Sequence, residues 1–220
     1  MNERSFNAWS EMKIAPASAP LPDKTRNAAL TARRQMILEA AVMCFLENGF
    51  HQTGVRDIAA RAGVSLGNLY NHFPGKHDVL LEIARLERME LDPFIAQLEK
   101  EGPAPKRFKK FVGAYAKYLA APENVILTIE ITSEAIRKDD LGELFRQNRE
   151  ALVSALKGLL DRGVENRDFT LPTTSEEAAH MVLELIEGRA YHSVLGEAKM
   201  GKLLPGLQSF LNAAIGTRTR

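Results

Sequence analysis

The chain has 220 residues, of which 45% are hydrophobic, and a formal net charge of +1, so it can bury one substantial core or two small ones. No apolar run approaches the length of a bilayer-spanning helix, and the N-terminal residues lack the apolar core of a secretory signal, so we expect a cytoplasmic protein without a membrane partner. Cys44 is the sole cysteine, which excludes an intrachain disulfide and a cysteine-based zinc site.

Charge is unevenly distributed along the chain. The stretch from Lys24 to His77 contains seven basic and three acidic residues, whereas the stretch from Asp78 to Lys100 contains three basic and six acidic residues. This distribution is compatible with two solvated faces. It is equally compatible with an N-terminal end that binds a polyanion such as DNA.

The first predicted elements are an arm and a helix. Residues 1–28 are rich in proline and are expected to form a flexible arm. The 3.6-residue spacing of apolar side chains predicts a helix that begins at Thr31 and ends at Gly49. Cys44 lies on the apolar stripe of this helix, which favours a buried core thiol over a nucleophile.

Helices are predicted through the rest of the chain, which gives an all-α fold. A helix that begins near Lys76 is expected to stop or bend before Pro93. The sequence VILTIEIT has the local propensity of a strand, but no partner strand is visible elsewhere, so we predict a helix there. A long amphipathic helix is expected to end near Gly163, and Thr174 with Glu177 forms a capping box that opens another.

The segment RDIAARAGVSLGNLYNHF, residues 56–73, contains two short predicted helices joined by a tight turn. Gly63 supplies the left-handed backbone that ends the first helix, and Ser65 can cap the second. The wedge between the two helices is filled by side chains at suitable spacing, namely Ile58, Val64 and Leu69. This arrangement predicts a helix-turn-helix, whose second helix enters the DNA major groove. A purely structural helical hairpin is the alternative.

Residues 36–83 resemble the DNA-binding domain of the TetR repressor family along their whole length. The resemblance rests on the patterns A..CF...GF and T.VRDIA..AGVS.G.LY.HF..K and on the apolar start of the helix that follows. It implies a helix-turn-helix domain at 29–77 and a ligand-binding and dimerisation domain at 78–220. It also implies a homodimeric repressor that a small-molecule effector releases from a palindromic operator in double-stranded DNA.

Seven residues are candidates for contact with DNA. The hydroxyls of Thr53 and Ser65 lie beside helix N-termini and suit phosphate oxygens. Tyr70 matches a phosphate contact of the family, although its ring alternatively packs on Phe50. Lys76 also suits a phosphate and is alternatively an ordinary solvated lysine. The outer face of the recognition helix presents side chains suited to base edges and thymine methyl groups, namely Leu66, Asn68 and Asn71.

The chain departs from the family pattern at two glycines. Gly54 and Gly75 stand where the family usually has a hydroxyl residue, and glycine offers a phosphate no side-chain oxygen. Operator affinity is therefore expected to depend more on Tyr70, Lys76 and the N-terminal arm.

The C-terminal residues are less informative about a ligand. A stripe of aromatic residues over 108–118 either lines a pocket or belongs to the core. Glu130 and Glu134 are one helical turn apart and would attract a cationic ligand if both faced inward; alternatively they are exposed or paired with arginine. The predicted ligand-binding residues are Phe111, Tyr115, Tyr118, Glu130, Glu134 and Met181.

Other classes of function are less well supported. His180 and Glu184 have the spacing of a metal site but no visible third ligand, so neither a metal nor a cofactor is expected. We find no nucleophile–base signature and no phosphate-binding glycine loop, so an enzyme is not expected. A DNA-binding protein without ligand control remains an alternative. The homodimer is predicted to form through residues 175–192 and 200–214, which would pair as a four-helix bundle.

Overall fold

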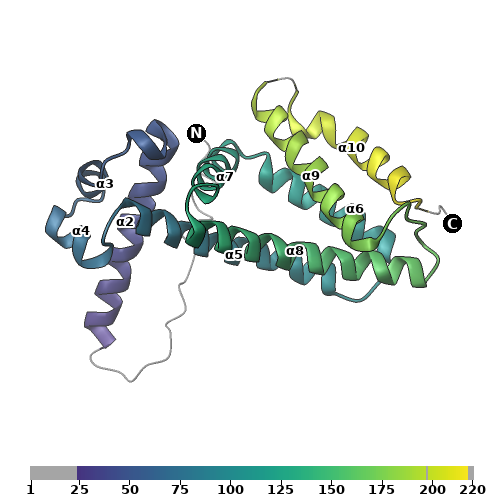
Figure 1. Ribbon diagram of the computed structural model, residues 1–220, viewed down its shortest axis with the longest axis horizontal. Helices are drawn as coiled ribbons and strands as arrows, with labels where there is room; N and C mark the ends of the chain where they lie inside the picture. The colour runs from purple at the N-terminus through teal and green to yellow at the C-terminus, as the bar shows by residue number, and fades with distance from the viewer. Residues whose placement is uncertain (1–23, 197, 218–220) are drawn as a thin grey trace. The chain divides into compact units, whose positions relative to one another are not determined.

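The computed structural model describes residues 24–196 and 198–217, and this part of the chain is α-helical (Figure 1). It contains nine helices and no strand within those residues, which confirms the predicted all-α fold. The chain forms two compact units, Met1–Ile83 and Ala84–Arg220, and the division falls within helix α5 (Lys76–Glu99). None of the described helices is long and apolar enough to cross a bilayer.

Helix α2 (Lys24–Gln52) differs from the prediction at both ends. It begins at Lys24 rather than Thr31, and the preceding residues 1–23 of the predicted arm lie outside the described part of the chain. Gly49 does not end the helix. It adopts φ +76° and kinks the chain, after which helical backbone resumes as far as Gln52. Cys44 is buried on this helix, as expected.

Helices α3 (Val55–Arg61) and α4 (Leu66–His72) form the predicted helix-turn-helix. Gly63 ends the first with φ +66°, in the left-handed region that glycine adopts without a Cβ clash. Ile58 and Leu69 are fully buried between the helices, and Val64 is half-buried. The local sequence therefore specifies this element and its small core.

Helix α5 passes through Pro93 without ending there, so the predicted stop is wrong and the alternative of a bend stays a prediction. Proline cannot donate to the carbonyl of the residue four positions earlier, which here is Met89. Met89 and Pro93 are both exposed, so water can satisfy that carbonyl. Leu91 and Leu98 pack into the core on the other side and stabilise the continuous helix.

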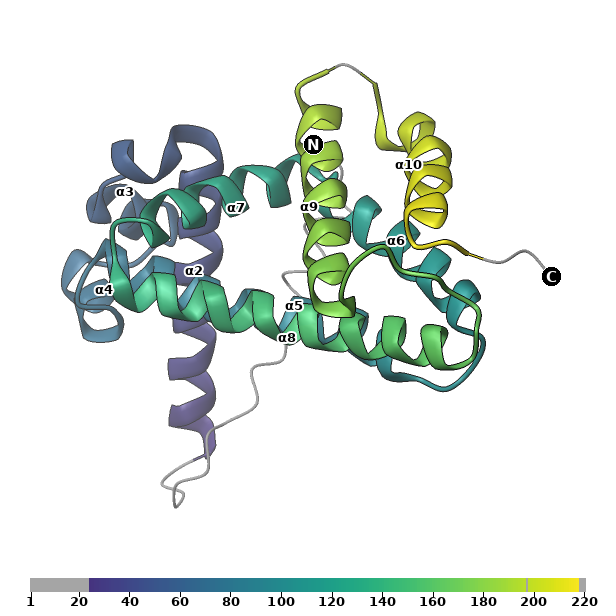
Figure 2. The same ribbon diagram turned by 45° about the vertical axis from the view of Figure 1, so that its right-hand side comes forward.

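The described part of the second unit contains five further helices (Figure 2). The helices are α6 (Ala104–Leu119), α7 (Pro122–Ala135), α8 (Asp139–Glu165), α9 (Ser175–Val194) and α10 (Met200–Ala214). The main apolar core of the unit is formed by α5 with α6, α8, α9 and α10. The sequence VILTIEIT is helical, as predicted. Thr174 caps helix α9 by accepting a hydrogen bond from the Glu177 amide at 3.2 Å.

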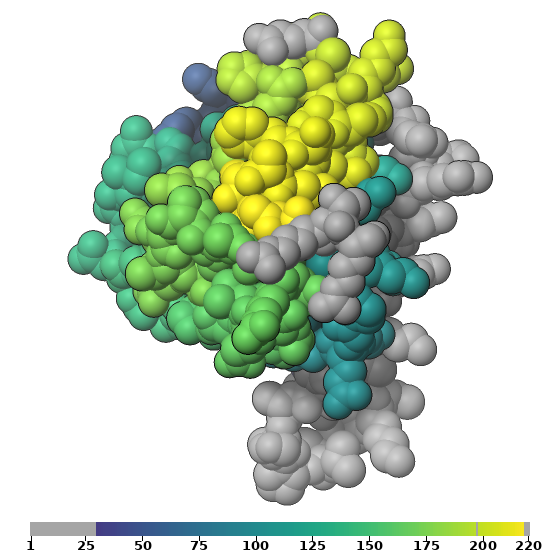
Figure 3. Space-filling view, turned by 90° about the vertical axis from the view of Figure 1, so that its right-hand side faces the viewer, coloured from purple at the N-terminus to yellow at the C-terminus, as the bar shows by residue number. Residues whose placement is uncertain are grey.

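Two hydrogen bonds fix α8 beside α5 within the second unit. The Asn148 amide donates to the Ala84 carbonyl at 3.0 Å, and Arg162 donates to the Leu98 carbonyl at 2.7 Å. In each bond the two residues are 64 positions apart in the sequence, so the two helices run side by side in the same direction. Helix α9 packs on α8 and α6, and α10 packs on α6 and α9 at the surface (Figure 3).

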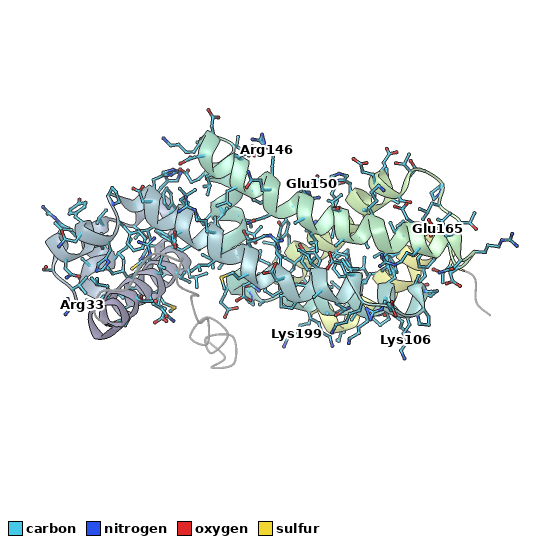
Figure 4. The ribbon with its side chains drawn as sticks, turned by 90° about the horizontal axis from the view of Figure 1, so that it is seen from below. Arg33, Lys106, Arg146, Glu150, Glu165 and Lys199 are labelled. Atoms are coloured by element: carbon cyan, nitrogen blue, oxygen red, sulfur yellow. The ribbon has the colours of Figure 1, made fainter. Side chains whose placement is uncertain are left out.

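The end of α8 lies slightly beyond the predicted Gly163, at Glu165. A Cβ at Gly163 would lie 2.0 Å from the ring of Phe169, so glycine here permits close packing rather than ending the helix. Charged side chains occupy the outside of the second unit, as Figure 4 shows for Lys106, Arg146, Glu150, Glu165 and Lys199.

Candidate DNA-binding and effector sites

The recognition helix α4 is fixed at its N-terminus by Ser65. The Ser65 hydroxyl oxygen accepts a hydrogen bond from the Asn68 amide at 3.1 Å, which is the predicted cap. Ser65 is also exposed, so its hydroxyl remains accessible beside the helix terminus.

The outer face of α4 presents polar side chains to solvent. Tyr70 is 49% exposed and Asn71 is exposed, whereas Leu66 and Asn68 are half-buried. Among the described residues, the aromatic rings that contact Phe50 are those of Phe45 and His51. Tyr70 is exposed instead, so its ring does not pack on Phe50. The side-chain oxygen of Asn68 is shielded from solvent and has no hydrogen-bond partner among the described residues. This face therefore carries hydrogen-bonding groups that the domain itself does not use.

The structure corrects the predicted role of Thr53 as a DNA-contacting residue. Its side chain is 2% exposed, and its hydroxyl donates to the carbonyls of Gly49 at 2.8 Å and Cys44 at 3.1 Å. The Thr53 amide also donates to the Gly49 carbonyl at 3.3 Å, so Thr53 stabilises the kink through both its side chain and its backbone. A contact of this hydroxyl with phosphate is therefore wrong.

Lys76 lies where α5 begins and contacts the turn between α2 and α3. Its ammonium donates to the carbonyls of Phe50 at 2.6 Å, Thr53 at 2.8 Å and His51 at 3.3 Å, and it lies 4.4 Å from the centre of the Phe50 ring. Lys76 is therefore not an ordinary solvated lysine. It closes the kinked end of α2, and its contact with phosphate stays a prediction.

Arg34 supports the other end of the recognition helix and was missed by sequence reasoning. It donates to the carbonyl of His72 at 3.1 Å, lies 4.3 Å from the centre of the Phe73 ring and pairs with Glu82 at 3.1 Å. Cations at helix C-termini stabilise the last carbonyls. Since Arg34 and its partners are far apart in sequence, no local pattern predicts these contacts.

Gly54 caps α3 through its backbone. The Gly54 amide donates to the Asp57 carboxylate at 2.8 Å. A Cβ at position 54 would lie 3.0 Å from the same carboxylate oxygen. A side chain at this position would therefore require the Asp57 carboxylate to shift by a few tenths of an ångström.

In the second unit, the predicted aromatic stripe is largely core. Phe111 and Tyr115 are buried, Tyr118 is half-buried, and the Phe111 and Tyr115 rings stack with centres 5.4 Å apart. Phe94 of α5 joins them, with its ring centre 5.4 Å from Tyr115 and 5.2 Å from Tyr118. Phe111 and Tyr115 therefore belong to the core, and a pocket lined by the stripe stays a prediction.

Carboxylates that the sequence did not single out lie beside these rings. Burial raises the pKa of Glu87 to about 7, and the nearby Glu187 carboxylate adds to the rise. Burial also raises the pKa of Glu187, although its ion pair with Arg149 at 2.7 Å opposes the rise. Burial and these two carboxylates raise the pKa of Tyr115. We call Glu87, Phe94, Tyr115, Tyr118 and Glu187 the acidic aromatic cluster.

The remaining predicted ligand residues lie elsewhere on the second unit. Glu134 is buried and its carboxylate is 3.5 Å from Arg137, which corresponds to the arginine-paired alternative. Glu130 is half-buried on the same helix, and its role stays a prediction. Met181 is 49% exposed on α9, so its side chain lies on the outer face instead of lining the core.

The Glu87→Gln variant is expected to be more stable than the wild type at pH 8 by about 1–2 kcal/mol, because a tenfold change in proton affinity corresponds to about 1.4 kcal/mol. The folded chain retains a proton on Glu87 up to about pH 7, whereas the usual pKa is 4.5. Wild-type stability should therefore fall as the pH rises through this interval, and glutamine removes the loss.

Thermal unfolding followed by circular dichroism at pH 5 and pH 8 measures this difference. Glu99→Gln is the matched control, since Glu99 is exposed near the end of the same helix. An equal effect of both substitutions at pH 8 would contradict the raised pKa of the half-buried Glu87.

Comparison with known proteins gives a family match for each of the two units. Residues 37–83 match the model of bacterial regulatory proteins of the tetR family, and residues 104–203 match that of the BetI-type transcriptional repressor C-terminal domain. The fatty acid metabolism regulator protein of Bacillus subtilis is 27% identical over 172 residues, which cover 74% of this chain and 84% of that protein.

Two solved structures share the fold. A transcriptional regulator from Saccharomonospora viridis in complex with choline has a TM-score of 0.76 at 21% identity and covers 86% of this chain and 100% of its own. FadR from Bacillus subtilis in complex with stearoyl-CoA has a TM-score of 0.69 at 22% identity, with coverage of 82% and 98%. With the capped recognition helix, these matches establish that the chain belongs to the TetR family of transcriptional regulators and binds DNA through its helix-turn-helix.

Proposed function

We propose that the chain represses transcription as a homodimer bound to a two-fold symmetric operator, and that a small effector in the second unit releases it. The observation that carries this proposal is the outer face of α4, where Tyr70 and Asn71 are exposed on a helix held by Ser65 and Arg34. Exposed amide and phenol groups on such a helix suit base edges and phosphates in a major groove.

The dimer is supported by exposed apolar side chains on the last two helices. Met181 and Leu185 are 49% and 39% exposed one turn apart on α9, and Phe210 is 61% exposed on α10. Large apolar side chains on neighbouring helices favour a protein interface. A two-fold axis through such an interface would also place two recognition helices on two half-sites.

Phe210→Glu is expected to shift the protein from dimer to monomer, because it places a charge in the proposed apolar interface. Light scattering at micromolar concentration measures the mass. Ile136→Glu is the matched control, since Ile136 is 82% exposed at the end of α7 and outside the proposed interface. A wild-type monomer, with or without DNA, would contradict the proposed assembly.

Operator binding can be tested without knowing the operator. Selection of bound duplexes from a random-sequence library by the purified chain is expected to enrich a palindrome with half-sites about one helical turn apart. Enrichment of no sequence, or of an asymmetric single site, would contradict the proposal.

Release by an effector is supported by the ligands of the two structural relatives, stearoyl-CoA and choline, each bound to a protein of this fold. These two ligands differ in charge and size, so they support a ligand in the second unit without indicating its chemical class. Effector binding should weaken operator binding, and the operator should weaken effector binding by the same factor, typically about 5–150-fold.

A further inference from the structure

The recognition helix α4 is too short to hold its own C-terminal end in place. It has 7 residues, and isolated helices shorter than about 12 residues are marginal in water. The Ser65 cap fixes its N-terminus, and the buried Leu69 anchors its middle. The last turn carries the exposed side chains of Tyr70 and Asn71. The positions of these two side chains therefore depend on the contacts that fix the last turn.

Arg34 of α2 fixes this turn from outside the helix. Its Nη1 donates to the carbonyl of His72 at 3.1 Å, and its guanidinium lies 4.3 Å from the centre of the Phe73 ring. His72 is the last residue of α4, and the carbonyls of a last turn have no partner within their own helix. Because Asn71 directly precedes His72, the bond from Arg34 holds the backbone next to the Asn71 side chain.

Glu82 of α5 orients the same guanidinium. The Nη2 of Arg34 is 3.1 Å from the Glu82 carboxylate, and both side chains are half-buried. The planar fork of arginine can serve two acceptors at once while its flat face lies over a ring, which the point charge of a lysine cannot do. Arg34, His72, Phe73 and Glu82 all belong to the first unit. The carbonyl, the ring and the carboxylate together fix the orientation of the guanidinium.

We propose that Arg34 is a positioning residue for sequence reading, which holds the last turn of α4 so that Asn71 meets a base edge. This inference rests on the proposed reading of an operator by the outer face of α4. A hydrogen bond to a base edge weakens steeply when its geometry is disturbed. Contacts with phosphate position the protein but carry no sequence information. Loosening the last turn should therefore weaken operator binding more than binding to random DNA.

Arg34→Met is expected to lower the ratio of operator affinity to random-duplex affinity about tenfold. Methionine retains an apolar stem beside Phe73 but removes both the donor to His72 and the partner of Glu82. Titration of the full chain with both duplexes measures the ratio, at a temperature at which circular dichroism shows the variant to be folded. A role in stability alone would leave the ratio at its wild-type value, and that result would overturn the proposal.

Arg33→Met is the matched control for the lost charge. Arg33 is the neighbouring arginine on α2 and is exposed (Figure 4). Removal of its charge is expected to change binding to both duplexes by the same factor, since charge acts on the phosphate backbone of any sequence. A tenfold fall of the ratio in Arg33→Met would assign the effect to charge and overturn the role of Arg34.

A double-mutant cycle tests whether Arg34 acts through Asn71. In an Asn71→Ala background, Arg34→Met is expected to lower the ratio by less than about twofold, because the side chain that it positions is already absent. The same tenfold fall in both backgrounds would show independent action and overturn the proposal. Glu82→Gln provides a second cycle that keeps the guanidinium. It is expected to lower the ratio severalfold in the wild type and not in Asn71→Ala, and it decides the question if Arg34→Met does not fold.

Failure of this inference is distinguishable from failure of the proposed function. The operator itself is selected with the wild-type chain, so the absence of any selected sequence would count against the proposed function. A selected operator that the wild type, Arg34→Met and Glu82→Gln all discriminate equally well from random DNA would overturn the positioning role alone.

Discussion

Lys76→Met is expected to destabilise the first unit by about 2–4 kcal/mol, which is the largest effect on stability that we predict. The ammonium donates to three carbonyls at the kinked end of α2 and lies over the Phe50 ring. Hydrogen bonds from a charged donor each contribute about 1.5–3 kcal/mol, and they are not additive. Methionine retains the apolar stem but leaves these carbonyls without their donor.

Chemical denaturation followed by circular dichroism measures the loss, and Lys106→Met is the matched control because Lys106 is exposed in the first turn of α6. Operator and random duplexes should both bind less tightly, since Lys76 supports the whole domain and carries no base contact. Unchanged stability with weakened binding would show that Lys76 acts only through phosphate.

Asn71→Ala is expected to cost about 1–3 kcal/mol of binding free energy on the selected operator and little on random duplexes, because an amide side chain can pair with a base edge. Asn71 is exposed on α4, so its removal should leave the stability of the domain unchanged. Titration of both duplexes at several salt concentrations separates this loss from a loss of phosphate contacts.

Asn166→Ala is the control for this substitution, since Asn166 is an exposed asparagine at the end of α8. An equal loss of affinity on operator and random DNA would place Asn71 against the backbone instead of a base. A change in preferred sequence caused by Lys76→Met but not by Asn71→Ala would place the recognition surface outside α4.

The elements that sequence predicts well are those with local causes. The left-handed turn at Gly63, the Ser65 cap and the Thr174 cap each depend on residues within a few positions, and all three are found. A stop of α5 before Pro93 was one of the two predicted outcomes and is wrong, because the helix is continued by the packing of Leu91 and Leu98 in the core. Tertiary contacts override the local preference there.

Prediction of the site residues from sequence is limited in the same way to features with local causes. The outer face of α4 could be predicted from helical spacing, whereas the contacts of Lys76 and Thr53 with the kink at Gly49 could not. Glu87 was not predicted, because an acidic residue in a charged stretch of helix usually indicates a solvated face. Only the folded chain brings it next to Tyr118 and Glu187 from other helices.

The most direct test of the regulatory account is operator affinity measured for the wild type and for Phe210→Glu, on the full palindrome and on a duplex with a single half-site. We expect the wild type to bind the palindrome more tightly and Phe210→Glu to bind the two duplexes alike, because a dimer contacts both half-sites. Equal affinities of the wild type for the two duplexes would contradict the proposed two-fold symmetric assembly.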